Sequence, residues 1–216
     1  DWGTGSTWVG GIAPVAGDDV VIASGTPVQI NGPVSCNNLT INSGCILTVN
    51  GTNSLTVAGN WQNNGTFNAT NSTVIFSGNT DTSFGGTSAT TFYDLTIAKT
   101  SGLDDVIDFN SSGVVTCTHN LTMTNGLLKF SSGTINLNCN SAFSILKPSG
   151  LWVAGATLNT GGFSITNEGL IRVSAGTVNF GTSSGNSIHT QIDGAFEVTG
   201  GNVFVTGRLE NSAGGT

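Results

Sequence analysis

Charged residues are scarce in this sequence of 216 residues. They make up only 8% of the chain, whereas an average soluble domain has roughly 25%. Only five are Lys or Arg, against twelve Asp and Glu, and the formal net charge is −7. Nucleic-acid binding proteins neutralise phosphates with clustered basic residues, and these five are few and scattered. We therefore expect no nucleic-acid partner, and the same shortage argues against anionic membrane surfaces.

Long hydrophobic runs are also missing. No stretch approaches the roughly 20 apolar residues of a transmembrane helix, so we expect no membrane insertion. The sequence starts at Asp1 without Met or a signal-like segment, which is typical of a processed or excised piece. It stops at Thr216, where another strand of the pattern described below should begin. We expect an open end there, with the remainder of the same chain as its first partner.

Strong helix formers are rare as well. The chain is poor in Lys, Glu, Arg and Ala, whereas Thr, Val, Ile and Phe favour strands. A hydrophobic content of 37% is enough to bury a core, and disorder usually needs low hydrophobicity with high net charge. The composition therefore predicts an ordered, all-β protein.

Four cysteines are present, with no CxxC motif and no Cys/His cluster. A zinc site is therefore not expected, and no cofactor is implied. Cys36 with Cys45, and Cys117 with Cys139, could form disulfides in an oxidising compartment. The alternative is that all four are small apolar residues of the core.

A repeat organises most of the sequence. Residues 126–137 (GLLKFSSGTINL), 169–180 (GLIRVSAGTVNF), 194–205 (GAFEVTGGNVFV) and 65–76 (GTFNATNSTVIF) align without gaps, and residues 150–158 fit with a deletion. Glycines at 25, 44, 65, 102, 126, 150, 169, 194 and 214 each follow a short lead-in such as NLTINSG. Their intervals are 19, 21, 37, 24, 24, 19, 25 and 20 residues. Only the 37-residue interval departs from the range.

Each unit reads as three short strands separated by Gly or Asn turns. Apolar residues alternate within the strands, as in Leu128 and Phe130, so one side of each strand faces a core. One unit cannot bury its apolar side alone, and stacked neighbours must cover it. The pattern predicts a right-handed parallel β-helix (β-solenoid) of about nine coils over residues 20–216. An aromatic-rich N-terminal cap would occupy residues 1–19, and residues 77–91 would be an insertion carrying a specialised surface.

The opening W…GG.AP.AGDDVVI, followed by the NLTI and GNWQNNGTFN coils, resembles large secreted β-helical proteins of the Bacteroidota. The resemblance is one of style and short motifs, and is best at residues 8–22 and 39–76. It implies export by the type IX secretion system, a cell-surface or extracellular location, and a role in adhesion or gliding motility. Secretion machinery and outer-membrane components would then be partners.

No catalytic constellation is visible. The best acidic cluster is Asp104, Asp105 and Asp108, where alternation would put Asp104 and Asp108 on one face; it is a solvated edge or a calcium site. His119 and His189 lie about three coils apart, too far for a dyad, so we name no catalytic, cofactor-binding or metal residue. Parallel β-helices do include polysaccharide lyases and hydrolases.

Two functions remain open on the residues alone. The first is a structural or adhesive shaft that has no enzymatic activity. The second is a carbohydrate-binding or polysaccharide-degrading module, in which polar ladders with Trp61 or Trp152 would contact surface glycans.

Overall fold

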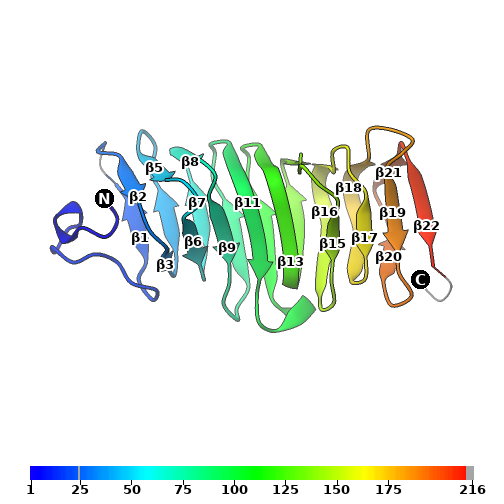
Figure 1. Cartoon of the computed structure of the whole chain (residues 1–216), viewed down its shortest axis with the longest axis horizontal. Helices are drawn as coiled ribbons and strands as arrows, with labels where there is room; N and C mark the ends of the chain where they lie inside the picture. The colour runs from blue at the N-terminus through cyan, green and yellow to red at the C-terminus, as the bar shows by residue number, and fades with distance from the viewer. Residues whose placement is uncertain (24, 213–216) are drawn as a thin grey trace.

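The computed structural model describes residues 1–23 and 25–212, and it is a parallel β-solenoid of about nine turns (Figure 1). The coils follow one another along one long axis, with β1 (Val20–Ile22) near one end and β22 (Arg208–Asn211) at the other. The described residues contain two helical turns of three residues each, η1 (Gly5–Thr7) and η2 (Gly102–Asp104), and neither could cross a membrane. The all-β, parallel solenoid prediction is confirmed.

Each coil adds one strand to each of three faces, which we number in the order the chain meets them. Face 1 contains β1 (Val20–Ile22), β4 (Leu39–Ile41), β7 (Trp61–Asn63), β10 (Thr82–Gly85), β12 (Val106–Asn110) and β20 (Ala195–Val198). Face 2 contains β2 (Val28–Ile30), β5 (Ile46–Val49), β8 (Thr66–Ala69), β14 (Thr134–Leu137) and β21 (Asn202–Val205). Face 3 contains β3 (Val34–Cys36), β6 (Ser54–Val57), β9 (Thr73–Phe76), β15 (Phe143–Ile145), β17 (Ile165–Asn167), β19 (Ser187–Thr190) and β22 (Arg208–Asn211).

Four longer strands turn a corner and serve more than one face. β11 (Thr90–Ala98) runs from face 2 to face 3, and β13 (Val115–Ser132) passes over faces 2, 3 and 1. β16 (Ser149–Asn159) and β18 (Leu170–Phe180) run from face 1 to face 2. These strands continue through the corners with local register shifts, as between Phe92 and Asp94.

The core is a set of columns of like side chains, because parallel pairing places the inward residue of one coil over that of the next. On face 1 the inward column includes four aromatic residues in succession, Trp61, Phe84, Phe109 and Phe130. The rings of Phe84 and Phe109 stack at 4.3 Å, and those of Trp61 and Phe84 at 5.7 Å. Aromatic pairs at such distances add to the free energy gained by burying their area.

The outer surface carries polar columns that are satisfied between coils. On face 2, Asn159 Nδ2 donates to Asn136 Oδ1 at 2.8 Å, and Asn179 Nδ2 donates to Asn159 Oδ1 at 2.8 Å. Thr134, Thr157 and Thr177 occupy the neighbouring column. Hydrogen bonds between side chains thus connect successive coils, in addition to the backbone hydrogen bonds between paired strands.

The residues before β1 fold against the first coil. The Trp2 backbone N–H donates to Gln29 O at 2.7 Å, and the Trp2 side chain is buried. Trp8 packs edge-on against Trp2, with ring centroids 5.2 Å apart, and its Nε1 donates to Trp2 O at 2.7 Å. Asp18 accepts a hydrogen bond from Val15 N, which holds the turn that leads into β1.

The landmark glycines do not all mark one corner. Gly44 and Gly65 lie between face 1 and face 2, whereas Gly102 and Gly126 lie between face 3 and face 1. The gap-free alignment of residues 65–76 with 126–137 therefore superposes strands of different faces. Gly150 is also one residue out of its column, since Ser149 is the partner of Gly126. The landmark Gly214 lies outside the described residues.

This change of corner explains the 37-residue interval. Between Gly65 and Gly102 the chain supplies β8, β9, β10 and the two arms of β11, which amount to one coil and two thirds of the next. Residues 77–91 include β10, which pairs with β7 and β12 in register. The expected insertion there is wrong, because the segment is an ordinary part of the solenoid wall.

Candidate functional site

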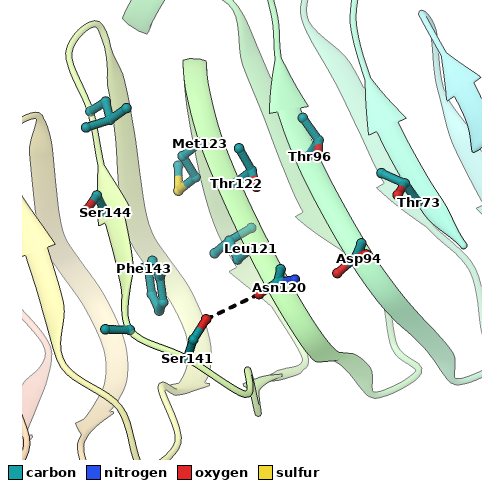
Figure 2. Close-up of a pocket in the computed structure, with 12 residues that line it drawn as sticks. Thr73, Asp94, Thr96, Asn120, Leu121, Thr122, Met123, Ser141, Phe143 and Ser144 are labelled. Carbon is teal, nitrogen blue, oxygen red and sulfur yellow. Dashed lines mark hydrogen bonds between the residues drawn. The ribbon is translucent and has the colours of Figure 1, made fainter. Parts of the chain in front are cut away.

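A groove of about 390 Å³ is open on face 3 (Figure 2). Its lining includes outward side chains of successive coils: Thr73 from β9, Asp94 and Thr96 from β11, Asn120 and Thr122 from β13, and Ser144 from β15. Hydroxyl, amide and carboxylate groups therefore share one surface hollow.

The groove follows a gap in strand pairing. Residues 94–97 of β11 pair one to one with 120–123 of β13, and β15 pairs with β17 at three positions. Between these regular regions, β13 and β15 pair only at Met123 and Ile145. The two strands separate before that point, so the groove reaches the buried side chains of Leu121 and Phe143.

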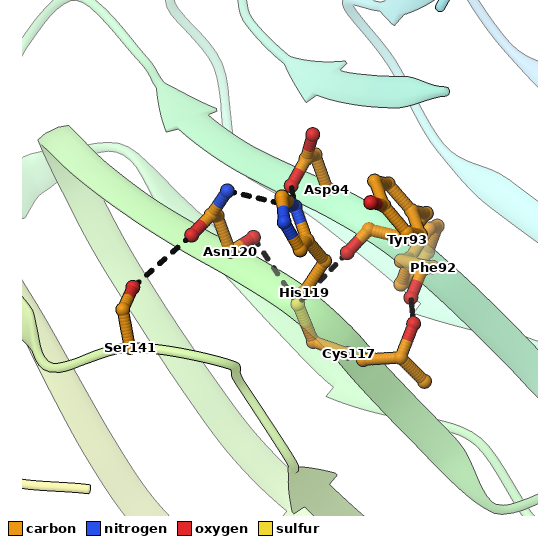
Figure 3. A network of polar contacts seen from close by, with 8 residues as sticks. Phe92, Tyr93, Asp94, Cys117, His119, Asn120 and Ser141 are labelled. Carbon is orange, nitrogen blue, oxygen red and sulfur yellow. Dashed lines mark hydrogen bonds and ion pairs between the residues drawn. The ribbon is translucent and has the colours of Figure 1, made fainter. Parts of the chain in front are cut away.

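His119 lies beside the groove and connects two coils (Figure 3). Its Nδ1 is 2.8 Å from Asp94 Oδ1 and 2.8 Å from Asn120 Nδ2, while Ser141 Oγ donates to Asn120 Oδ1 at 3.2 Å. A protonated Nδ1 donates to Asp94, and an unprotonated Nδ1 accepts from Asn120, since one nitrogen cannot do both at once. The imidazole thus has a partner in either tautomer.

A β-bulge orients this histidine. Phe92 pairs with Cys117 and Asp94 pairs with Asn120, so Thr118 and His119 together stand opposite Tyr93. The extra residue places the His119 ring against the Tyr93 ring, and the two stack with centroids 4.3 Å apart and planes at 15°. Nothing in the repeat pattern signals a bulge, so the sequence analysis assigned no contact to His119.

The groove is chemically suited to binding. It offers neutral donors and acceptors with one carboxylate, a set that matches the hydroxyl groups of a saccharide. In the part of the chain that the structure describes, the hydrogen bonds of the His119 ring go to Asp94 and Asn120. These contacts position the groove's walls and do not pair the imidazole with a nucleophile.

A second outward column runs along face 1. Its members are Ser83, Asp108, Lys129, Trp152, Arg172 and Glu197, each in register with the next. Lys129 pairs with Asp108 at 2.9 Å and Arg172 with Glu197 at 2.8 Å, so the charges are compensated within the column.

The two tryptophans expected to contact glycans have different surroundings. Trp61 belongs to the buried aromatic column, so its expected role at the surface is wrong. Trp152 does lie on the outer side, but Lys129 Nζ and Arg172 Cζ lie 5.0 and 5.7 Å from its ring centroid. Its Nε1 donates to Ser174 Oγ at 2.8 Å. The indole is therefore engaged by its own neighbours.

The three clustered aspartates are separated. Asp104 lies in η2, not in a strand, so the expected alternation of Asp104 and Asp108 on one face is wrong. Asp105 is buried and accepts from the backbone N–H groups of Thr100 and Ser101. Burial alone would raise the pKa of Asp105, but these bonds, together with the Ser101 side chain and the charge of Lys99, outweigh it and the pKa is lowered. Across residues 1–23 and 25–212, no three potential metal ligands gather.

Comparison with known proteins returns no relative. No family model matches the chain, and no curated protein or solved structure is significantly similar to it.

Proposed function

We propose that this chain is a shaft segment of a secreted or cell-surface bacterial protein, with a structural or adhesive role and no enzymatic activity. The observation that carries the proposal is the continuity of the stacking. Aromatic columns run inside, and asparagine and ion-pair columns run outside, each linking one coil to the next. At about 4.8 Å per coil, nine coils form a rod on the order of 40 Å long.

Such a rod resists bending because adjacent coils share backbone, core and surface contacts. A stiff spacer is what a protein needs to hold a terminal module away from a cell surface. The low content of charged residues, which make up 8% of the chain, suits an extracellular role. The resemblance to secreted Bacteroidota proteins supports export through the type IX secretion system.

The test is where the protein is found and what its removal changes. Antibodies against this chain should label intact cells of the source bacterium, and labelling should disappear when its export system is disabled. Deleting the coding segment should reduce surface attachment or gliding. A chain confined to the cytoplasmic fraction would refute the proposal.

We propose glycan binding as a second role, on the strength of the face 3 groove alone. Thr96 and Thr122 present hydroxyls beside Asp94 and Asn120, and the break in pairing between β13 and β15 gives the groove its depth. Hydrogen bonds from such groups recognise neutral sugars without requiring basic residues.

Affinity electrophoresis in gels containing neutral polysaccharides, such as a soluble β-glucan or a galactomannan, tests this role. The wild-type chain should be retarded, and the Thr96→Val, Thr122→Val double variant should lose most of that retardation. Thr134→Val on face 2 is the matched control and should migrate as wild type. Equal retardation of all three proteins, or none, would rule out the groove as the site.

A further inference from the structure

The four cysteines are all buried thiols, and two of them lie at one corner in consecutive coils. Cys117 lies in β13, where it pairs with Leu137 of the next coil, and Cys139 follows two residues after Leu137. Both residues occupy the corner between face 2 and face 3, in consecutive coils. The chain therefore returns to the same corner one turn later with a second thiol.

The same short segment surrounds both sulfurs. Cys117 Sγ is 3.2 Å from Asn120 O and 3.7 Å from Tyr93 O (Figure 3). Asn140 N donates to His119 O at 2.7 Å, so the backbone beside Cys139 lies over the backbone that follows Cys117. The neighbouring Cys117 thiol and, less strongly, the Leu121 backbone lower the pKa of Cys139. Neighbouring buried thiols on adjacent coils can come within bonding distance by side-chain rotation.

Cys36 and Cys45 provide an internal contrast. Cys36 belongs to β3 on face 3, and burial, with a smaller effect from Asp19, raises its pKa to about 12. Cys45 precedes β5, and its Sγ lies 3.9 Å from Ser43 O. The Cys36 thiol is therefore influenced by Asp19, and the Cys45 thiol contacts Ser43.

We propose that Cys117 and Cys139 form a disulfide bond that clamps two consecutive coils, while Cys36 and Cys45 remain thiols. The bond would lie beside the place where β13 and β15 pair at only one position. It would therefore reinforce the wall where the hydrogen-bond ladder is weakest, at the edge of the face 3 groove.

The chemistry needs a two-electron oxidant, for which a small disulfide such as glutathione disulfide suffices. The exchange needs no other reagent whichever of the two thiolates reacts first, and one order starts at Cys139. The Cys139 thiolate attacks glutathione disulfide and releases one glutathione. Cys117 then loses its proton, attacks the Cys139 sulfur and expels the second glutathione, so two protein thiols are oxidised and one disulfide is reduced.

Both sulfurs are buried, so we expect the oxidant to reach them while the corner is still open during folding. Formation of the bond in the cell rests on the proposed export to an oxidising compartment. The reaction in vitro depends only on the geometry, so the two ideas can fail separately.

The positions of Lys and Arg make the test unambiguous. Full-length chain is refolded from the reduced, unfolded state in a glutathione redox buffer, unfolded again in acid, alkylated and digested with trypsin without reduction. Cleavage after Lys99, Lys129 and Arg172 separates Cys36 and Cys45 in residues 1–99 from Cys117 in 100–129 and Cys139 in 130–172. Mass spectrometry should find peptide 100–129 linked to 130–172, and peptide 1–99 carrying two alkyl groups.

Four alkylated cysteines, or a linkage that includes peptide 1–99, would overturn the proposal. In the Cys36→Ala, Cys45→Ala variant the linked pair should persist, whereas Cys117→Ser should abolish it with an unchanged far-UV circular dichroism spectrum. A disulfide closing a loop of about 22 residues also restricts the unfolded chain. Reductant should therefore lower the Tm of the oxidised wild type by several degrees and leave that of Cys117→Ser unchanged; equal shifts would also refute the bond.

Discussion

The ammonium of Lys129 lies 2.9 Å from the Asp108 carboxylate on the neighbouring strand of face 1, and each side chain is less than one third exposed. The second Asp108 oxygen is enclosed and has no hydrogen-bond partner among the residues that the structure describes. Within the same residues, Lys129 compensates the charge of this carboxylate, and it does so from the next coil. The ion pair thus joins two adjacent coils, as the asparagine and aromatic columns also do.

Replacing Lys129 with Met should lower the free energy of unfolding by about 1–2 kcal/mol, because it leaves a partly buried carboxylate without its charged partner. Urea unfolding at neutral pH measures the change. Adding Asp108→Asn should restore most of the loss. The control is Lys147→Met, since Lys147 and Asp193 are largely exposed and 4.0 Å apart, and it should be nearly neutral. A Lys129→Met protein as stable as wild type would contradict the argument.

The asparagine column on face 2 should show a dependence on position. Asn159 makes bonds to both Asn136 and Asn179, whereas Asn136 makes one within the column. At about 0.5–1 kcal/mol per bond, Asn159→Ala should cost roughly twice as much as Asn136→Ala. Urea unfolding of the two variants measures both losses in the free energy of unfolding. Equal losses would contradict the prediction and would mean that water replaces the side-chain hydrogen bonds.

Gly176 cannot be replaced without strain. Its φ is +82°, and an added Cβ would lie 2.2 Å from the carbonyl oxygen of Ala156 in the coil below. Gly176→Ala should destabilise the protein by roughly 1–3 kcal/mol. Gly17→Ala is the control, because a Cβ at Gly17 meets nothing within 4 Å. Comparable Tm values for the two variants would show that the coils can separate to accommodate the methyl group.

Acid should weaken the attachment of the first coils through Asp19. Its Oδ1 accepts from Asn37 Nδ2, Asn38 N and Asn38 Nδ2, and these bonds lower its pKa below 3.8, the Asn37 bond most. A group whose pKa is lower in the folded state stabilises the fold above its unfolded pKa, and this contribution is lost as the pH falls through the folded value. Thermal unfolding should be followed at a series of pH values from neutral downwards. As the pH falls, the Tm of Asp19→Asn should decrease less than the Tm of the wild type. Superimposable pH profiles would exclude Asp19 as a contributor.

The sequence by itself determined the architecture, since alternation at period two and turns every 19 to 25 residues leave stacked coils as the way to bury the apolar side. It also identified the aromatic-rich segment at the N-terminus and the scarcity of charge. These are local properties, which each strand carries without reference to its neighbours.

Only the tertiary structure decided which corner each glycine marks, and therefore that residues 77–91 are wall and not insertion. It likewise placed Trp61 inside and Trp152 outside, and brought His119 to Asp94 through a bulge. The physical reason is that a shift of one residue exchanges the inner and outer sides of a strand, and a shift of one strand exchanges faces. Both choices are settled by packing against the adjacent coil, which no single repeat encodes.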